Sequence, residues 1–366
     1  MASPFTMKWI LEDLHRIRAS LRYGDSNQRR NFDGRRVKFQ MDLTCQWCGE
    51  HGPAEEFDLD EQNHEGFWCP SCDGFTYYDD SKNHLRRILL ILEQSNGSTS
   101  ADVPRTKLRK RLSPLRYPGG KSKLIDYLAS QFKRESLETF VEVFAGGASV
   151  GLALLDAGLT KQLVINDVDP GIYAFWNQVV NNPEPLLRRL SGDAPTLSEF
   201  RFMKSVLNDP PKWHRQEELA WATLICNRLS YSGISKANAM GGANGSANQL
   251  LARWNPAALQ KRIRHIHERA DRITVSCVDA VELLENSAYW DEKSTCFIDP
   301  PYVMKGKALY RRWYEEEDHE QLAFIIQSLY QGMPGADLVI TYDDCPLIRE
   351  IYPYADVVTI GRRYSV

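Results

Sequence analysis

The stretch Thr295-Cys-Phe-Ile-Asp299-Pro-Pro-Tyr302 joins an apolar run to a carboxylate, two prolines and an aromatic ring. It predicts a buried strand that ends at Asp299, and in open α/β sheets ligands bind beyond the carboxyl ends of the strands. The prolines stiffen the turn and lack N–H donors, so carbonyl groups stay available as acceptors. Asp299 and the Pro300 carbonyl can both accept from one amino group, and the Tyr302 ring can stack on a flat ring. The set suits the exocyclic amine of a nucleobase; the alternative is a strand-end turn capped by Asp299.

The composition is that of a globular protein. A chain of 366 residues, 43% of them hydrophobic and 11% aromatic, has room for one large domain and a smaller one. The apolar run at residues 88–92 is too short to span a bilayer, and residues 1–4 lack the basic segment of a secretory signal. Outside two closely spaced pairs, the cysteines lie singly in apolar contexts, as reduced core thiols do: Cys226, Cys277, Cys296 and Cys345. We therefore expect a cytoplasmic protein with no membrane partner.

Basic residues are unevenly distributed along the chain. The net charge is only −3, which excludes a strong overall positive field. Three basic runs nonetheless occur, at residues 29–38, 105–111 and 253–272. A single run is more often a solvated face, but three in one chain favour a surface that follows a phosphate backbone.

Four cysteines have the spacing of a metal site. They form two Cys-x-x-Cys pairs separated by residues 49–68: Cys45, Cys48, Cys69 and Cys72. Four thiolates fill a tetrahedral shell, which indicates a structural Zn²⁺ ion with no open position. The alternative, a pair of redox dithiols, is disfavoured because that motif occurs singly at a helix start.

The first part of the chain is predicted to form a separate unit. Apolar residues at helical spacing predict helices at residues 8–22 and 83–94, on either side of the cysteine pairs. Residues 95–100 are polar and have the composition of a flexible linker. We place the first domain boundary there, so that residues 1–100 hold a helix and a zinc ribbon.

Glycine turns follow the linker. In Tyr117-Pro-Gly-Gly-Lys121, adjacent glycines before a lysine at a helix start allow the backbone to approach an anion. A strand at residues 139–144, the turn Ala145-Gly-Gly147 and a helix at 148–156 form a doubly wound unit. The next strand, at residues 162–167, ends in Asp167, which is placed to bind ribose hydroxyls.

These segments, in this order, resemble one known family. Arg116-Tyr-Pro-Gly-Gly-Lys121, Val141-Glu-Val-Phe-Ala-Gly-Gly-Ala-Ser149, Asn166-Asp167 and Asp299-Pro-Pro-Tyr302 are similar to the Dam-type DNA adenine N6-methyltransferases in their alpha arrangement. The resemblance covers roughly residues 112–366 and extends to Asp318-His319 and Val339-Ile-Thr-Tyr-Asp343. It implies a Rossmann-like, S-adenosylmethionine-dependent methyltransferase sheet of the α/β class.

The resemblance also implies residue roles. Asp299, Pro300 and Tyr302 would be catalytic. The residues expected to bind the cofactor are Tyr117, Lys121, Asp167, Asp299, the backbone cradle Phe144, Gly146 and Gly147, and Asp279 near the cofactor adenine. The sequence departs from the family pattern at two places. Val143 stands where the family often has proline, and the chain reaches Val366 without the further strand that the family usually has.

An insert at about residues 181–270 resembles the family's recognition region. Arg228 and the loop after it would contact DNA: Tyr231 as a wedge in the space left by an extruded base, Ser232 at the orphaned partner and Lys236 at a base edge. The alternative is that Tyr231 belongs to the core. Residues 101–180 and 271–366 would then form the cofactor-binding and catalytic halves of the domain.

We therefore expect a site-specific adenine N6-methyltransferase that acts on double-stranded DNA and is associated with the nucleoid. Its setting would be a restriction-modification or phage-defence system, with companion restriction or defence proteins as partners. Three alternatives stay open: an RNA adenine methyltransferase, a cytosine N4-methyltransferase, which usually has Ser at the position of Asp299, and a zinc-ribbon DNA-binding protein with weakened catalysis.

Overall fold

The structure is a computed structural model. It describes residues 87–94, 107–109, 111–117, 119–208, 216–234, 236–242, 244–285, 293–304, 306, 311–332 and 336–361, and short pieces nearer the N-terminus at 42–44, 51–53, 58–59, 66–68, 71 and 75–77.

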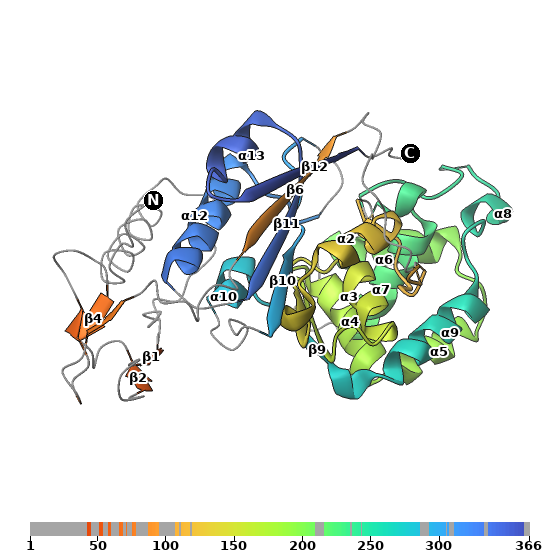
Figure 1. The fold of residues 1–366 in the computed structure, drawn as a ribbon. Helices are drawn as coiled ribbons and strands as arrows, with labels where there is room; N and C mark the ends of the chain where they lie inside the picture. Colours follow the sequence, from red (N-terminus) through yellow and green to blue (C-terminus); the bar gives the residue numbers. More distant parts are fainter. Residues whose placement is uncertain are drawn as a thin grey trace.

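The centre of the molecule is a seven-stranded sheet with the order β12-β6-β11-β10-β7-β8-β9 (Figure 1). All of its neighbouring strands are parallel. The strands are β6 (Ile88–Gln94), β7 (Thr139–Glu142), β8 (Gln162–Asn166), β9 (Ile273–Ser276), β10 (Ser294–Ile298), β11 (Asp337–Asp343) and β12 (Asp356–Gly361). This topology confirms the predicted α/β, Rossmann-like class.

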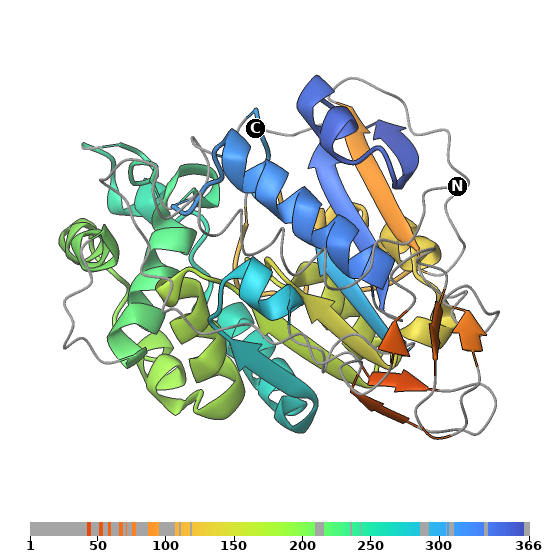
Figure 2. The ribbon, with the colours of Figure 1, turned by 90° about the vertical axis from the view of Figure 1, so that its left-hand side faces the viewer.

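Helices cover both faces of the sheet (Figures 1 and 2). One face packs against α2 (Ile125–Gln131), α3 (Ser149–Asp156) and α4 (Pro170–Asn181). The other packs against α10 (Ala280–Leu284), α12 (Glu316–Gly332) and α13 (Pro346–Ile351). Short 3-10 turns are η2 (Lys121–Lys123), η3 (Arg134–Ser136) and η5 (Ala270–Arg272). Because alternate residues of a strand point to opposite faces, each strand supplies both cores.

The predicted insert forms a helical lobe at one side of the sheet (Figure 1). It contains α5 (Glu184–Leu190), α6 (Leu197–Asn208), α7 (Gln216–Leu229), η4 (Tyr231–Gly233), α8 (Ala247–Leu250) and α9 (Pro256–His267). Helix α7 is buried along residues 220–229 and packs between α4 and α6. It therefore connects the lobe to the cofactor-binding half predicted from the sequence.

The helix predicted at residues 83–94 is wrong. Ile88–Gln94 is the strand β6, which lies between β11 and β12 and pairs with both. Leu89 and Ile91 face one core, and Leu90 and Leu92 face the other. A short apolar run fits a buried strand as well as a helix. Residues before the predicted boundary near residue 100 thus contribute to the sheet; the division into domains stays a prediction.

The described N-terminal pieces include a two-stranded and a three-stranded antiparallel sheet. Strands β1 (Asp42–Thr44) and β2 (His51–Pro53) pair with each other, and β4 (Gly66–Trp68) pairs with β3 (Asp58–Leu59) and β5 (Phe75–Tyr77). In the sequence, Cys45 and Cys48 fall between β1 and β2, and Cys69 and Cys72 between β4 and β5. The four cysteines and the helix predicted at residues 8–22 lie outside the described residues.

The described residues contain no group of three or more His, Cys, Asp or Glu side chains that could hold a metal ion. No helix in that part of the chain is long and apolar enough to cross a membrane.

Candidate active site

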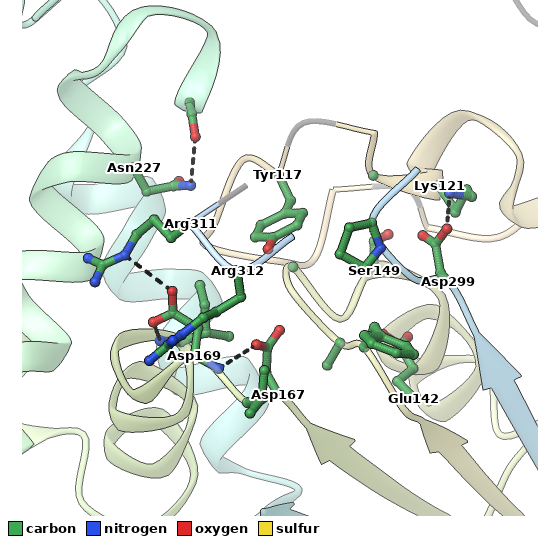
Figure 3. Close-up of a pocket in the computed structure, with 18 of the residues that line it drawn as sticks. Tyr117, Lys121, Glu142, Ser149, Asp167, Asp169, Asn227, Asp299, Arg311 and Arg312 are labelled. Carbon is green, nitrogen blue, oxygen red and sulfur yellow. Dashed lines mark hydrogen bonds and ion pairs between the residues drawn. The ribbon is translucent and has the colours of Figure 1, made fainter. Parts of the chain in front are cut away.

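Acidic residues from three neighbouring strands line one pocket at the carboxyl edge of the sheet (Figure 3). Glu142 ends β7, Asp167 follows β8 and Asp299 follows β10. The strands are parallel, so their carboxyl ends lie at the same edge. The pocket encloses about 1180 Å³ of empty space, part of it open to solvent. The three carboxyl groups therefore line one pocket that is partly open to solvent.

Asp299 is held by two donors on one of its oxygens. Its Oδ1 accepts from Lys121 Nζ at 2.5 Å and from Thr341 Oγ1 at 2.7 Å. Within the described part of the chain, no hydrogen bond goes to Oδ2. Burial raises the pKa of Asp299, and the Lys121 ammonium opposes that shift. The carboxylate is thus fixed in orientation and keeps one oxygen for a ligand in the pocket.

The glycine turn after β7 is shaped by the Tyr117 ring. Gly146 has φ +47°, and a Cβ there would lie 2.7 Å from Tyr117 Cε1. Trp176 Nε1 donates to the Gly146 carbonyl at 2.9 Å and fixes the turn from the other side. Tyr117, Phe144 and Gly147 all line the pocket. The structure therefore brings these predicted residues together around one turn at the pocket, which we call the cradle; their role in binding a cofactor stays a prediction.

Asp167 lies at the floor of the same cradle. Its Oδ2 accepts from the Gly146 N–H at 2.8 Å, and its Oδ1 accepts from the Asp169 N–H at 2.9 Å. Burial, and then the charge of Asp169, raise the pKa of Asp167 to about 7. A carboxylate has about four acceptor positions, so these bonds leave capacity for hydroxyl groups of a ligand. Asp169 caps α4, with its Oδ1 accepting from the Gly171 N–H at 2.8 Å.

Residues 117–366 match the family of D12 class N6 adenine-specific DNA methyltransferases. The chain belongs to this family. It is 22% identical over 247 residues to the type II methyltransferase M.MjaIII of Methanocaldococcus jannaschii, covering 62% of this chain and 82% of the relative. It is 24% identical over 229 residues to the type II methyltransferase M.FokI of Planomicrobium okeanokoites, covering 60% of this chain and 34% of the relative. The predicted activity, DNA adenine N6-methylation, is confirmed at the level of the family.

Some predicted residues of the methyltransferase lie away from the pocket wall. Asp279 caps α10, with its Oδ1 accepting from the Val281 N–H at 3.0 Å, and it does not line the pocket. Tyr302 is 8% exposed and packs in the core below Lys121, whose Nζ lies 4.8 Å from the ring centre. Pro301 lines the pocket, whereas Pro300 does not. The roles assigned to Asp279, Pro300 and Tyr302 stay predictions.

The recognition loop of the methyltransferase forms a short hairpin. Ser230 and Ala239 form an antiparallel bridge, and Ser232 between them has φ 55°. Tyr231 is 57% exposed, so the alternative that it belongs to the core is wrong. Lys236 is also exposed, and its Nζ lies 4.1 Å from the centre of the Trp313 ring, which lines the pocket. The hairpin therefore reaches the pocket mouth.

Arg228 differs from its predicted environment. It is 8% exposed and donates to the Pro114 carbonyl, so its side chain fastens the insert to the segment before Tyr117. Burial, and then the charges of Arg262 and Arg116, lower its pKa to about 10. Arg228 lies in the last turn of α7 and its side chain points into the core. The structure therefore does not place it on a surface that could contact DNA.

The sequence analysis did not assign several residues that lie at the methyltransferase site. Glu142 is buried beside Lys121, accepts from the Gly151 N–H, and has its pKa raised to about 8 chiefly by burial. Asn227 lines the pocket from the insert. Glu93 lies 3.5 Å from Lys121 Nζ. Only Glu142 had a local signal, an acid at the end of a buried strand.

Proposed function

We propose that this methyltransferase transfers the methyl group of S-adenosylmethionine to N6 of an adenine that has been rotated out of duplex DNA into the pocket. One observation carries the proposal: Asp299 has Oδ1 held by Lys121 and Thr341 at a pocket that it shares with Asp167. Asp299, which can accept hydrogen bonds from an amine, and Asp167, which can accept them from hydroxyl groups, thus face one pocket. Transfer from a nucleoside cofactor to an amine requires this arrangement.

The residues of the cradle fit the cofactor. The Asp167 carboxylate suits a ribose diol, and the turn at Gly146 and Gly147 brings backbone close to a ligand without side chains. The Tyr117 ring packs on this turn and offers an aromatic surface. When bound, S-adenosylmethionine supplies an electrophilic methyl group on a positively charged sulfur.

Asp299 and the Pro300 carbonyl would accept the two N–H groups of the adenine amine. The amine is a poor nucleophile because its lone pair is conjugated into the ring, and these acceptors favour a pyramidal nitrogen with a directed lone pair. A prepositioned carboxylate also stabilises the positive charge that develops on that nitrogen. Asp299 need not be a strong base, since the N–H proton becomes acidic only after the methyl group has been transferred.

The insert would hold the duplex. Tyr231 is an exposed aromatic ring on a turn and suits a wedge, with Ser232 and Lys236 beside it. Two pairs of arginines lie close enough for their charges to repel, Arg116 with Arg253 and Arg262 with Arg111. Arg111, Arg253 and Arg262 belong to the second and third basic runs, which supports phosphate contacts. Affinity for duplex should then fall steeply with salt.

The N-terminal segment would carry a structural Zn²⁺ ion held by the four cysteines. The proposal rests on the Cys-x-x-Cys spacing and on antiparallel strand pairs on either side of each cysteine pair in the sequence. The names of the two relatives, type II methyltransferases, support a restriction-modification setting with a companion endonuclease.

A methyl-transfer assay tests the function. The purified chain is incubated with labelled S-adenosylmethionine and with matched duplex DNA, RNA or no nucleic acid, and the modified bases are then sequenced. We expect N6-methyladenine at a fixed motif in duplex DNA. Label in RNA alone would favour the RNA alternative, N4-methylcytosine would favour the cytosine alternative, and no transfer despite DNA binding would indicate weakened catalysis.

A further inference from the structure

Strand β6 comes from outside the part of the chain that matches the methyltransferase family. The family match begins at residue 117, yet β6 occupies residues 88–94 within the sheet. Near its carboxyl end, Glu93 pairs in register with Asp343 of β11 and Ile360 of β12. Its side chain is only 2% exposed. A segment outside the family domain therefore places a carboxylate at the catalytic edge of the sheet.

The Lys121 ammonium connects Glu93 to the catalytic aspartate. Lys121 is 2% exposed, and its Nζ lies 3.5 Å from Glu93 Oε1 and 2.5 Å from Asp299 Oδ1. It also donates to the Gly119 carbonyl at 3.3 Å. An ammonium has three N–H donors at tetrahedral angles to one another. Oxygens from three separate segments therefore determine where this buried charge lies.

Strand β6 is fixed along its length. At its start, Arg87 forms a bidentate pair with Asp337, at 3.1 Å from Nε to Oδ1 and 2.9 Å from Nη2 to Oδ2. At its end, Gln94 Nε2 donates to Asp344 Oδ2 at 2.8 Å, and the Asp344 N–H donates to the Glu93 carbonyl at 3.2 Å. A slip by one residue would turn Glu93 to the other face of the sheet. These contacts hold it beside Lys121.

A buried carboxylate is costly unless it is paired, and an apolar residue would suit the sheet centre better. We propose that Glu93 is a positioning residue of the methyl-transfer site, which holds the Lys121 ammonium in place against Asp299 Oδ1 and so fixes the orientation of the catalytic carboxylate. The proposal rests on the role of Asp299 in the proposed function. It makes the segment before residue 100 a part of the active site.

The test compares Glu93→Gln with wild type in the full chain. Gln keeps the size of the side chain and removes its charge. We expect the single-turnover rate to fall by about tenfold or more, the scale of a small misplacement of a catalytic group, with duplex affinity unchanged. Asp356→Asn, which removes a charge from an exposed position of the neighbouring strand β12, is the matched control and should keep the wild-type rate.

The pH profile separates positioning from a structural effect. The charged groups that face Asp299 are Lys121 from η2, Glu93 from β6 and Glu142 from β7. The Glu93 charge raises the pKa of Asp299, so removing that charge lowers it. The acid limb of the pH–rate profile should therefore move to lower pH in Glu93→Gln and stay in place in Asp356→Asn.

A wild-type rate and an unmoved acid limb in Glu93→Gln would overturn the proposal. Thermal melting checks that the variant folds; if it does not, Glu93→Asp keeps the charge and withdraws it from Lys121, and a wild-type rate there would overturn the proposal as well. If the wild type itself transfers no methyl group to DNA, the proposed function fails instead.

Discussion

The side-chain amide of Asn227 holds the main chain of Arg116 from both sides. Its Oδ1 accepts from the Arg116 N–H at 2.7 Å, and its Nδ2 donates to the Arg116 carbonyl at 2.6 Å. Asn227 lies in α7, just before the recognition hairpin, and Arg116 precedes Tyr117 of the cofactor cradle. Gly233 of the hairpin packs on the same Arg116 carbonyl, where a Cβ would approach to 2.6 Å. Hairpin and cradle are therefore linked.

Asn227→Ala should lower the stability of the protein and its affinity for the cofactor, because Asn227 links the hairpin to the cradle. It leaves the N–H and carbonyl of Arg116 without their partner, which costs about 1–3 kcal/mol. We expect a lower melting temperature and weaker S-adenosylmethionine binding by calorimetry. Asn181→Ala, an exposed amide at the end of α4, is the control and should change neither. Unchanged cofactor affinity in a folded Asn227→Ala protein would separate the hairpin from the cradle.

Asp299→Asn removes the charge and presents an NH₂ group to the adenine amine. Loss of one preorganised electrostatic partner predicts a rate lower by about 10²-fold or more. Duplex affinity should stay within a few fold, and Asp299→Ser should keep weak activity. Single-turnover assays with labelled cofactor measure the rates of wild type, Asp299→Asn and Asp299→Ser. Asp356→Asn, on the exposed edge strand β12, is the control. A wild-type methyl-transfer rate in Asp299→Asn would show that Asp299 only caps the turn.

Asp167→Ala should weaken S-adenosylmethionine binding by about 1–3 kcal/mol, because ribose hydroxyls lose a charged acceptor. The pKa of Asp167 is raised to about 7, so its acceptor charge is present above pH 7 and is lost as pH falls below it. Wild-type affinity should therefore decrease from pH 8 to pH 6, and the decrease should be smaller in Asp167→Ala. Calorimetry that finds no difference between the two proteins would move the ribose site elsewhere.

Tyr231→Ala tests the wedge. If the ring fills the space of an extruded base, its loss should slow methylation more than it weakens duplex binding. A target adenine in a mismatch is easier to extrude and should recover part of the rate. Phe202→Ala, another exposed aromatic of the insert, should behave as wild type on both substrates. Equal losses on matched and mismatched targets would argue against the wedge.

The cysteine spacing predicts about one tightly bound zinc ion per chain, because four thiolates leave no open position. Metal analysis of the purified protein should find it, and Cys45→Ser should lose zinc and stability together. The lone buried cysteine of α7, changed as Cys226→Ser, should keep the zinc content. Zinc far below one equivalent in the wild type would rule out the ribbon.

Local sequence patterns were enough to predict those parts of the site that lie within a single short segment. The sequence determined the strand before Asp299, the glycine turn at Gly146 and the acid Asp167 after the next strand, and the structure has all three. Each consists of an apolar run followed by a residue whose side chain or backbone freedom defines the turn. Such signals extend over a few residues and do not depend on distant partners.

Only the tertiary structure decided the rest. Ile88–Gln94 is a strand because it pairs with Leu338–Asp343 and with β12, residues that lie far along the chain. Arg228 is buried where it donates a hydrogen bond to the Pro114 carbonyl. Glu93 lies beside Lys121 because β6 pairs with β11 in the sheet. An apolar run or a single charge carries no information about which distant segment will pack on it, and that packing sets both its conformation and its role.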